Sequence, residues 1–384
     1  MYKKLLAVLV IFFMSINLTY AAEPAGGYAR SAIVIDAASG KVLYEKNAYE
    51  KLGMASTTKI MTGICGIEFG NLDSVVKVSS RAARVEGSSM YLEAGEKLKL
   101  YDVITGLMLV SGNDAATAIA ESVGGSEGGF VLLMNQKANE IGVKNTCFQN
   151  PHGLSDSGHY TTAYDLALIS AYALKNPVFA EIVSQKSKKV ESVDGRVRTL
   201  VNHNKLLRLY EGCMGVKTGF TKATGRCLVS AAKRDGLTLV CVTLNDGNDW
   251  NDHIMMLDKG FSNYKAQALV KKGTVLAKAK ISRGKEKNVS LVAENDESVA
   301  IKKGETSKLS ISVKENINLE APIEKGKRYA KADIIENGKK IGEIDLVAVE
   351  DVDEAKKESK TKKGIFNWIF KKVLRREEPF CVKK

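Results

Sequence analysis

The strongest constraint on the fold is a long helical stretch enclosed by strand patterns. Residues 31–46 predict a β-hairpin, and residues 226–244 predict a second one. Helical periodicity dominates between them from Tyr101 to Leu174, and another helix is predicted from Trp250 to about Tyr264. Strands at both ends with helices between them indicate one α+β domain, residues 22–265, in which the terminal strands share a sheet.

After residue 265 the pattern changes to short β-rich segments separated by turns. These segments are residues 288–292, 298–301, 308–313, 334–335 and 341–347. Their spacing is typical of a small all-β sandwich, which we place at residues 266–349. Residues 350–364 are almost all charged and are predicted to form a linker.

The first 21 residues have the pattern of a secretory signal peptide. Lys3 and Lys4 precede an apolar run from Leu5 to Leu18, and small residues follow at Thr19 and Ala21. We therefore expect cleavage after Ala21 and export of the chain. An uncleaved membrane anchor is the alternative.

Residues 365–374 predict an amphipathic helix near the end of the chain. Its apolar face carries Ile365, Phe366, Ile369, Phe370 and Val373. The segment is much shorter than the ~20 apolar residues that span a bilayer, and it is more aromatic than an ordinary solvated end. We expect residues 350–384 to bind an anionic membrane surface, the outer face of the cytoplasmic membrane. The alternative is docking of this helix onto the β-domain.

The net charge of +13 is unevenly distributed. Residues 355–384 contain eleven Lys and Arg against three Glu, and the first 21 residues add two lysines. Only +3 is left for residues 22–354. The basic excess thus belongs to the two ends, which argues against nucleic acid as a partner.

Six cysteines in a chain of 384 residues do not resemble the dense framework of a small disulfide-rich domain. No cysteine pair has metal-site spacing and only four histidines are present, so a zinc enzyme is not indicated. We expect most cysteines to be buried apolar thiols. No metal ion and no organic cofactor is expected.

Three short motifs occur in order along the first domain. They are Ser56-Thr57-Thr58-Lys59, Ser111-Gly112-Asn113 and Lys217-Thr218-Gly219. Each is weak alone: Ser56 could be a helix N-cap, the second motif an interhelix loop, and the third a strand whose glycine packs against another backbone. Their combination, order and wide separation match the set of motifs found in β-lactamases and penicillin-binding proteins.

The residues around these motifs resemble the D-alanyl-D-alanine carboxypeptidase family of low-molecular-mass penicillin-binding proteins. The resemblance rests on residues 55–62, 111–116, 150–154, 158–166 and 215–221. It covers about residues 28–265 and, more loosely, the β-domain and tail. It implies a β-lactamase/transpeptidase-like catalytic domain that removes the terminal D-alanine from peptidoglycan stem pentapeptides. It also implies covalent inhibition by β-lactam antibiotics.

The expected catalytic residues are Ser56, Lys59 and Ser111. Lys59 lies one helical turn after Ser56, so its amine can take the proton of the nucleophilic hydroxyl. Lysine keeps its proton up to pH ~10.4 unless it is desolvated or near another cation, and Lys217 is the candidate cation. Ser111 is expected to pass a proton to the departing D-alanine.

The expected substrate-binding residues are Asn113, Lys217, Thr218, Gly219 and Phe220. By the resemblance, Asn113 holds the substrate amide, and Lys217 and Thr218 hold the terminal carboxylate. The backbone N–H groups of Ser56 and Phe220 form the oxyanion hole. Because the lysine-based set needs no catalytic histidine, structural roles near the site are expected for His152 and His159.

Three other functions are alternatives to this one. A β-lactamase of the same fold needs an additional glutamate in a Glu-x-x-Leu-Asn pattern, which this chain lacks. An endopeptidase that cuts cross-links would form the same acyl-enzyme, so the sequence separates it poorly. A non-catalytic wall-binding or β-lactam-sensing protein is disfavoured because all three motifs are complete.

Overall fold

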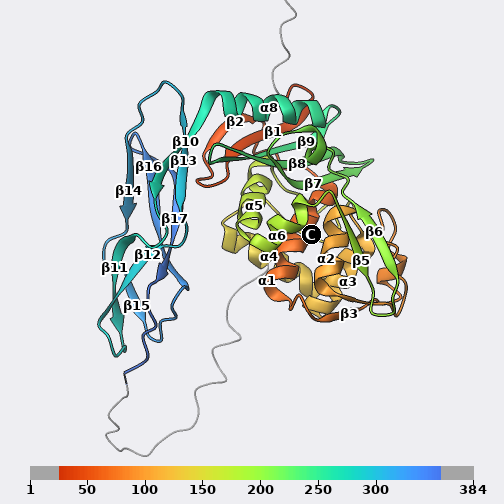
Figure 1. Ribbon diagram of the computed structural model, residues 1–384, viewed down its shortest axis with the longest axis horizontal. Helices are drawn as coiled ribbons and strands as arrows, with labels where there is room; N and C mark the ends of the chain where they lie inside the picture. The colour runs from red at the N-terminus through yellow and green to blue at the C-terminus, as the bar shows by residue number, and fades with distance from the viewer. Residues whose placement is uncertain (1–25, 356–384) are drawn as a thin grey trace, which may run out of the picture.

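Strands from both ends of the first domain form one antiparallel sheet, in the order β2-β1-β9-β8-β7 (Figure 1). The strands are β1 (Ala29–Asp36), β2 (Val42–Lys46), β7 (Cys213–Thr221), β8 (Gly225–Arg234) and β9 (Leu237–Asp246). The prediction that the terminal strands share a sheet is confirmed. The computed structural model describes residues 26–355, so the predicted signal peptide and the predicted amphipathic helix lie outside the described residues.

Helices cover both faces of this sheet (Figure 1). One face packs against α8 (Asp249–Asn263) and the other against a cluster of helices. The cluster contains α1 (Lys59–Phe69), α2 (Leu100–Leu109), α3 (Asn113–Gly124), α4 (Glu127–Ile141), α5 (Ala163–Lys175) and α6 (Pro177–Ser184). The short helices are α7 (Leu206–Leu209) and the 3-10 helices η1 (Ala55–Thr58) and η2 (Ala82–Arg84). Within residues 26–355 no single helix is long and apolar enough to span a membrane; only α5 and α6 together, bent by 104°, reach that length.

Alternate strand residues enter two separate cores. Ile33 and Ile35 of β1 face the helical cluster, whereas Ala32 and Val34 face α8. All four are almost fully buried, so a shift of one residue in register would exchange the two cores. Helix α1 lies within the helical core, with residues 59–67 buried. The residues at its beginning are therefore held by packing on several sides.

A small hairpin contacts the loop before α2 through the side chain of Arg198. It consists of β5 (Ser187–Glu191) and β6 (Val197–Val201), and a second short pair is β3 (Val75–Lys77) with β4 (Lys97–Lys99). The Arg198 guanidinium donates to the Met90 carbonyl oxygen at 3.1 Å and pairs with the Glu96 carboxylate at 2.5 Å. Because Glu96 is almost fully buried, removal of Arg198 would leave an uncompensated charge.

The second domain is a β-sandwich, as predicted. One layer pairs β10 (Tyr264–Val270) with β13 (Glu297–Lys302), and a sheet in the order β14-β16-β17-β12-β11-β15 forms the rest. These strands are β11 (Val275–Ser282), β12 (Asn288–Ala293), β14 (Leu309–Val313), β15 (Asn318–Glu320), β16 (Arg328–Glu336) and β17 (Lys339–Ala348).

The β-domain continues beyond its predicted end at residue 349. Val352 pairs with Ile323, and Glu354 pairs with Gly284. The Val352 side chain is almost fully buried. Charged side chains around Val352 face solvent while the backbone pairs, which is why composition alone placed a linker here.

The turn between β1 and β2 fixes the second domain against the first. The buried Asp36 carboxylate accepts the N–H of Ala300 at 3.0 Å, and Lys41 Nζ donates to the carbonyl oxygen of Ala300 at the same distance. Lys41 also pairs with Glu336 at 2.6 Å. The contact is thus made by oriented polar groups from both domains.

Gly342→Ala should loosen this contact, because a Cβ atom at Gly342 would lie 2.3 Å from the carbonyl oxygen of Ser39. We expect a loss of about 1–3 kcal/mol in the free energy of unfolding, seen as a lower Tm. The matched control is Gly128→Ala in α4, where the added methyl group meets no atom within 4 Å. It should leave Tm unchanged or raise it, since alanine favours helix. An unchanged Tm for Gly342→Ala would contradict the close approach.

Candidate active site

A short turn places Ser56 at the beginning of α1. Ala55 precedes it with a φ of 47°, a left-handed conformation that is uncommon for a residue with a side chain. The hydroxyl groups of Thr57 and Thr58 donate back to the carbonyl oxygens of Met54 and Ala55 at 2.6 and 2.8 Å. The Ser56 hydroxyl caps neither η1 nor α1. The turn is thus stabilised by its neighbours, and Ser56 keeps its hydroxyl for another contact.

The Lys59 side chain is fully buried next to Ser56. Its Nζ atom lies 2.9 Å from Ser56 Oγ, 2.7 Å from Asn113 Oδ1 and 2.6 Å from the carbonyl oxygen of His152. The Asn113 amide is oriented because its Nδ2 donates to the Glu86 carbonyl oxygen at 2.6 Å. The Asn113 and His152 oxygens can only accept hydrogen bonds. A neutral Lys59 amine can donate to both and direct its lone pair at the Ser56 hydroxyl.

The environment favours this neutral amine. Burial, followed by the positive charge of Lys217, holds the pKa of Lys59 well below its usual value of 10.5. The carboxylate of Asp114 acts in the opposite direction with a smaller effect. Burial also lowers the pKa of Lys217, to about 7. A base is therefore available near neutral pH, where general-base catalysis is most effective.

Ser111 and Asn113 lie where α2 passes into α3. Ser111 has a φ of 62°, a second left-handed residue at a motif, and both side chains are almost fully buried. The neighbouring Asp114 was not predicted from the sequence. Its buried carboxylate accepts the N–H groups of Met90 and Leu92 at 2.9 and 3.0 Å. Asp114 thereby fixes the loop opposite Ser111. An acidic residue in the first turn of a helix was the available signal, and it is a weak one.

Strand β7 passes directly against the Ser56 turn. A Cβ atom on Gly219 would lie 3.0 Å from the Ser56 nitrogen, a tight contact that glycine avoids. Lys217 is almost fully buried and donates from Nζ to the carbonyl oxygen of Thr218 at 3.0 Å. Phe220, by contrast, is 63% exposed.

A cavity of about 310 Å³ brings several predicted residues together. Its predicted lining residues are Ser56, Ser111, Thr218, Gly219 and Phe220. Lys59, Asn113 and Lys217 are buried and do not belong to the lining. The lining also contains residues that the sequence analysis missed, namely Ser88, His203, Lys205, Arg226, Asp249 and Trp250. They come from two loops, from β8 and from the beginning of α8, and no motif marks them.

His152 and His159 support the site from the loop before α5. His152 provides the carbonyl oxygen that Lys59 contacts, and His159 Nε2 lies 2.7 Å from the hydroxyl of Thr58. Burial lowers the pKa of His152 to about 3 and that of His159 to about 4. Both rings are therefore neutral and weakly basic near pH 7, as suits structural groups.

Comparison with known proteins decides the family. Residues 19–248 match the family described as D-alanyl-D-alanine carboxypeptidase, and residues 264–354 match the C-terminal domain of penicillin-binding protein 5. The chain belongs to the D-alanyl-D-alanine carboxypeptidase family. It is a serine peptidase of the low-molecular-mass penicillin-binding class, with D-alanyl-D-alanine carboxypeptidase activity.

The relatives align with most of both domains. D-alanyl-D-alanine carboxypeptidase DacF of Bacillus subtilis is 36% identical over 85% of this chain and 86% of its own length. DacC of Escherichia coli is 34% identical over 85% and 84%. The solved structure of penicillin-binding protein 5 from Haemophilus influenzae is 28% identical, with a TM-score of 0.64 over 85% of this chain and 98% of that one. The predicted catalytic fold and β-sandwich are confirmed.

Replacing buried Lys217 by methionine, which has a similar length and no charge, should raise stability. Folding lowers the pKa of Lys217 from 10.5 to about 7, so between these pH values the unfolded chain binds more protons than the folded chain. The destabilisation is therefore complete below pH 7 and disappears as the pH rises toward 10.5. We expect Lys217→Met to gain roughly 1–4 kcal/mol at pH 7 and less at pH 10, measured by urea unfolding.

The control for this measurement is Lys222→Met, because Lys222 is exposed in the turn after β7. Its stability should change by no more than about 0.5 kcal/mol. An equal gain for Lys217→Met at both pH values would show that the buried charge is not its cause.

Proposed function

We propose that this carboxypeptidase removes the terminal D-alanine from peptidoglycan stem pentapeptides through an acyl-enzyme on Ser56. The observation that carries the proposal is the contact of 2.9 Å between Lys59 Nζ and Ser56 Oγ, made by an amine whose pKa is lowered by burial and by Lys217. A serine hydroxyl becomes an effective nucleophile only when a nearby base takes its proton. Lys59 is the base that meets this requirement.

In the first step Ser56 Oγ attacks the carbonyl carbon between the two D-alanines, and its proton moves to Lys59 Nζ. The backbone N–H groups of Ser56 and Phe220 stabilise the negative oxygen of the tetrahedral intermediate. The assignment of these two N–H groups is supported by the close approach of Gly219 to the Ser56 turn, where an added Cβ would lie 3.0 Å from the Ser56 nitrogen. The two N–H groups thus belong to segments that are already in contact.

In the second step the bond to the terminal D-alanine breaks, and Ser111 relays to the departing amine the proton that Lys59 took from Ser56. Asn113 holds the substrate amide with the hydrogen of Nδ2 that does not bond to Glu86. Thr218 contacts the terminal carboxylate, and Lys217 behind it supplies positive charge. Water then attacks the acyl-enzyme, which releases the shortened peptide and restores the Ser56 hydroxyl.

β-Lactams would acylate the same hydroxyl, which provides a direct test. Fluorescent penicillin should add its mass to the peptide that contains Ser56, and Ser56→Ala should lose both the label and the release of D-alanine from a pentapeptide. Ser187→Ala is a suitable control, because Ser187 is exposed on β5 and does not line the cavity over Ser56. It should keep the label. Labelling that persists in Ser56→Ala would remove Ser56 as the nucleophile.

We further propose that the protein is exported through residues 1–21 and held at the outer face of the cytoplasmic membrane by residues 365–374. Both proposals rest on sequence pattern. The supporting features of the tail are its aromatic apolar face and the nearby Lys371, Lys372, Arg375 and Arg376, which suit anionic headgroups.

A chain that ends at Ala355 keeps the paired end of the β-domain and lacks this tail. It should release D-alanine from a soluble pentapeptide at the normal rate but should no longer sediment with vesicles of anionic phospholipid. The full-length protein should sediment, and less so at high salt. If both chains sediment equally, the membrane anchor lies elsewhere, and an uncleaved amino terminus becomes the alternative.

A further inference from the structure

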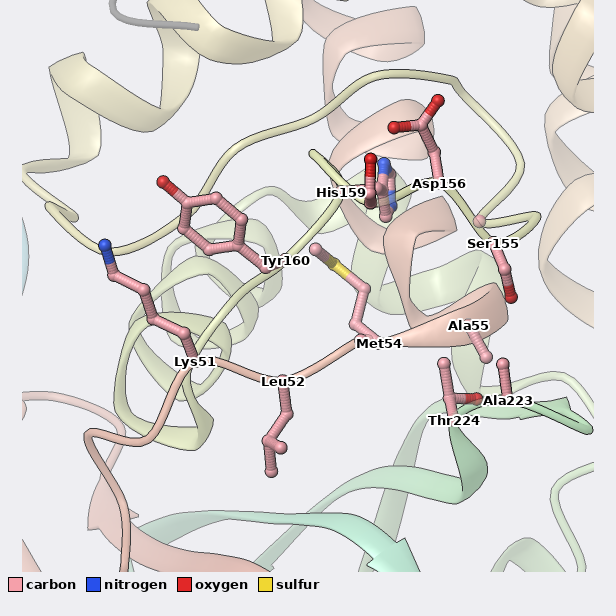
Figure 2. Close-up of a pocket in the computed structure, with 13 residues that line it drawn as sticks. Lys51, Leu52, Met54, Ala55, Ser155, Asp156, His159, Tyr160, Ala223 and Thr224 are labelled. Atoms are coloured by element: carbon pink, nitrogen blue, oxygen red, sulfur yellow. The ribbon is translucent and has the colours of Figure 1, made fainter. Parts of the chain in front are cut away.

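A second pocket, of about 450 Å³, adjoins the Ser56 turn and shares no lining residue with the cavity described above (Figure 2). Three segments that adjoin active-site residues or β7 form its walls. They are residues 51–55 before Ser56, residues 153–160 after His152, and residues 223–224 after β7. Gly153 packs so tightly on this turn that an added Cβ would lie 1.9 Å from the Ala55 carbonyl oxygen.

The two ends of the pocket differ in character (Figure 2). Ser155, Ala223 and Thr224 lie at the end next to Ala55, and Lys51 and Tyr160 lie at the other. The hydroxyl of Ser155 lies 3.2 Å from that of Thr221, the last residue of β7. The near end of the pocket therefore lies next to the last residue of β7.

The proposed substrate path leads to this end. With the terminal carboxylate at Thr218 and the scissile carbonyl oxygen at the Phe220 N–H, the rest of the peptide continues past Phe220 toward Thr221. An extended chain advances ~3.3 Å per residue, so the third residue of the stem lies within about 7 Å of the scissile bond. From there its side chain can extend toward Ser155, which contacts Thr221 and lines the near end of the pocket.

Charge determines which side chain fits. Lys51 Nζ lies 4.8 Å from the centre of the Tyr160 ring, and no carboxylate among residues 26–355 pairs with it. The carboxylate of Asp156 lies on another wall and accepts the N–H of Gly158 at 2.8 Å. A side chain that ends in both a carboxylate and an ammonium group complements these two charges. A lysine side chain would bring a second ammonium group toward Lys51.

We propose that this pocket is the subsite for the third residue of the stem peptide, and that Lys51 selects a diamino dicarboxylic acid over lysine. The inference rests on the proposed function, because it uses the proposed placement of the substrate on β7. It assigns a specificity role to a lysine that no catalytic motif contains.

The test measures kcat/KM for D-alanine release from three peptides that differ only at the third residue: meso-diaminopimelic acid, its side-chain carboxamide, and lysine. We expect the wild-type protein to prefer the carboxylate over the isosteric carboxamide by about fivefold, the upper range for one solvent-exposed ion pair. Lys51→Gln should reduce this ratio to about one, and it should improve turnover of the lysine peptide relative to the carboxylate peptide.

Lys222→Gln is the matched control, because Lys222 is exposed near the same turn but does not line the pocket. It should keep the wild-type ratio. An equal change in both variants would mean a general field of positive charge and would overturn the subsite, as would a wild-type ratio of one. If D-alanine is released equally fast from the peptides with the carboxylate and the carboxamide, the subsite is overturned but the proposed function stands. If no peptide releases D-alanine, the proposed function fails and the subsite fails with it.

Discussion

The burial of two lysine side chains close to one another is the physical constraint on which the active site depends. A buried ammonium group is costly, and two that repel each other are costlier, so the protonated form of Lys59 is disfavoured. The surrounding structure provides what a neutral amine needs: two oxygens that can only accept, from Asn113 and His152, and one hydroxyl that can donate. Three segments far apart in sequence must therefore meet at a single nitrogen atom.

This requirement explains features of the fold that have no catalytic role of their own. Helix α1 is buried along most of its length, which fixes the position of Lys59. Asp114 holds the loop at Met90 and Leu92, and so maintains the wall next to Asn113. Left-handed backbone at Ala55 and Ser111 is a further cost, tolerated because the packing around both residues determines their conformation. Stability is thus given up at the site and recovered in the two cores on either side of the sheet.

The sequence predicted the parts of the structure that depend on local pattern or on short motifs. Alternating apolar residues predicted β1, β8 and β9, and the three motifs predicted that Ser56, Lys59 and Asn113 belong to one site. The contact between Lys59 and Asn113 itself was not predicted. It did not predict His203, Arg226 or Trp250 in the cavity lining, because only the folded chain brings these residues to the same place. The pairing of Val352 with Ile323 was also not predicted, because it depends on the folded β-domain. Charged composition describes the side chains of that segment, whereas the backbone decides whether it pairs.

The contact between the domains adds a geometric consequence. Asp36 and Lys41 hold both the N–H and the carbonyl oxygen of Ala300, so β13 cannot slide along the first domain without loss of two oriented hydrogen bonds. The described chain ends at Ala355, whose N–H donates to the carbonyl oxygen of Arg283. In Figure 1 this end of the β-domain, near β11 and β15, lies away from the junction between α8 and β10. On the proposed anchoring by the tail, the β-domain would therefore stand between the membrane and the cavity over Ser56.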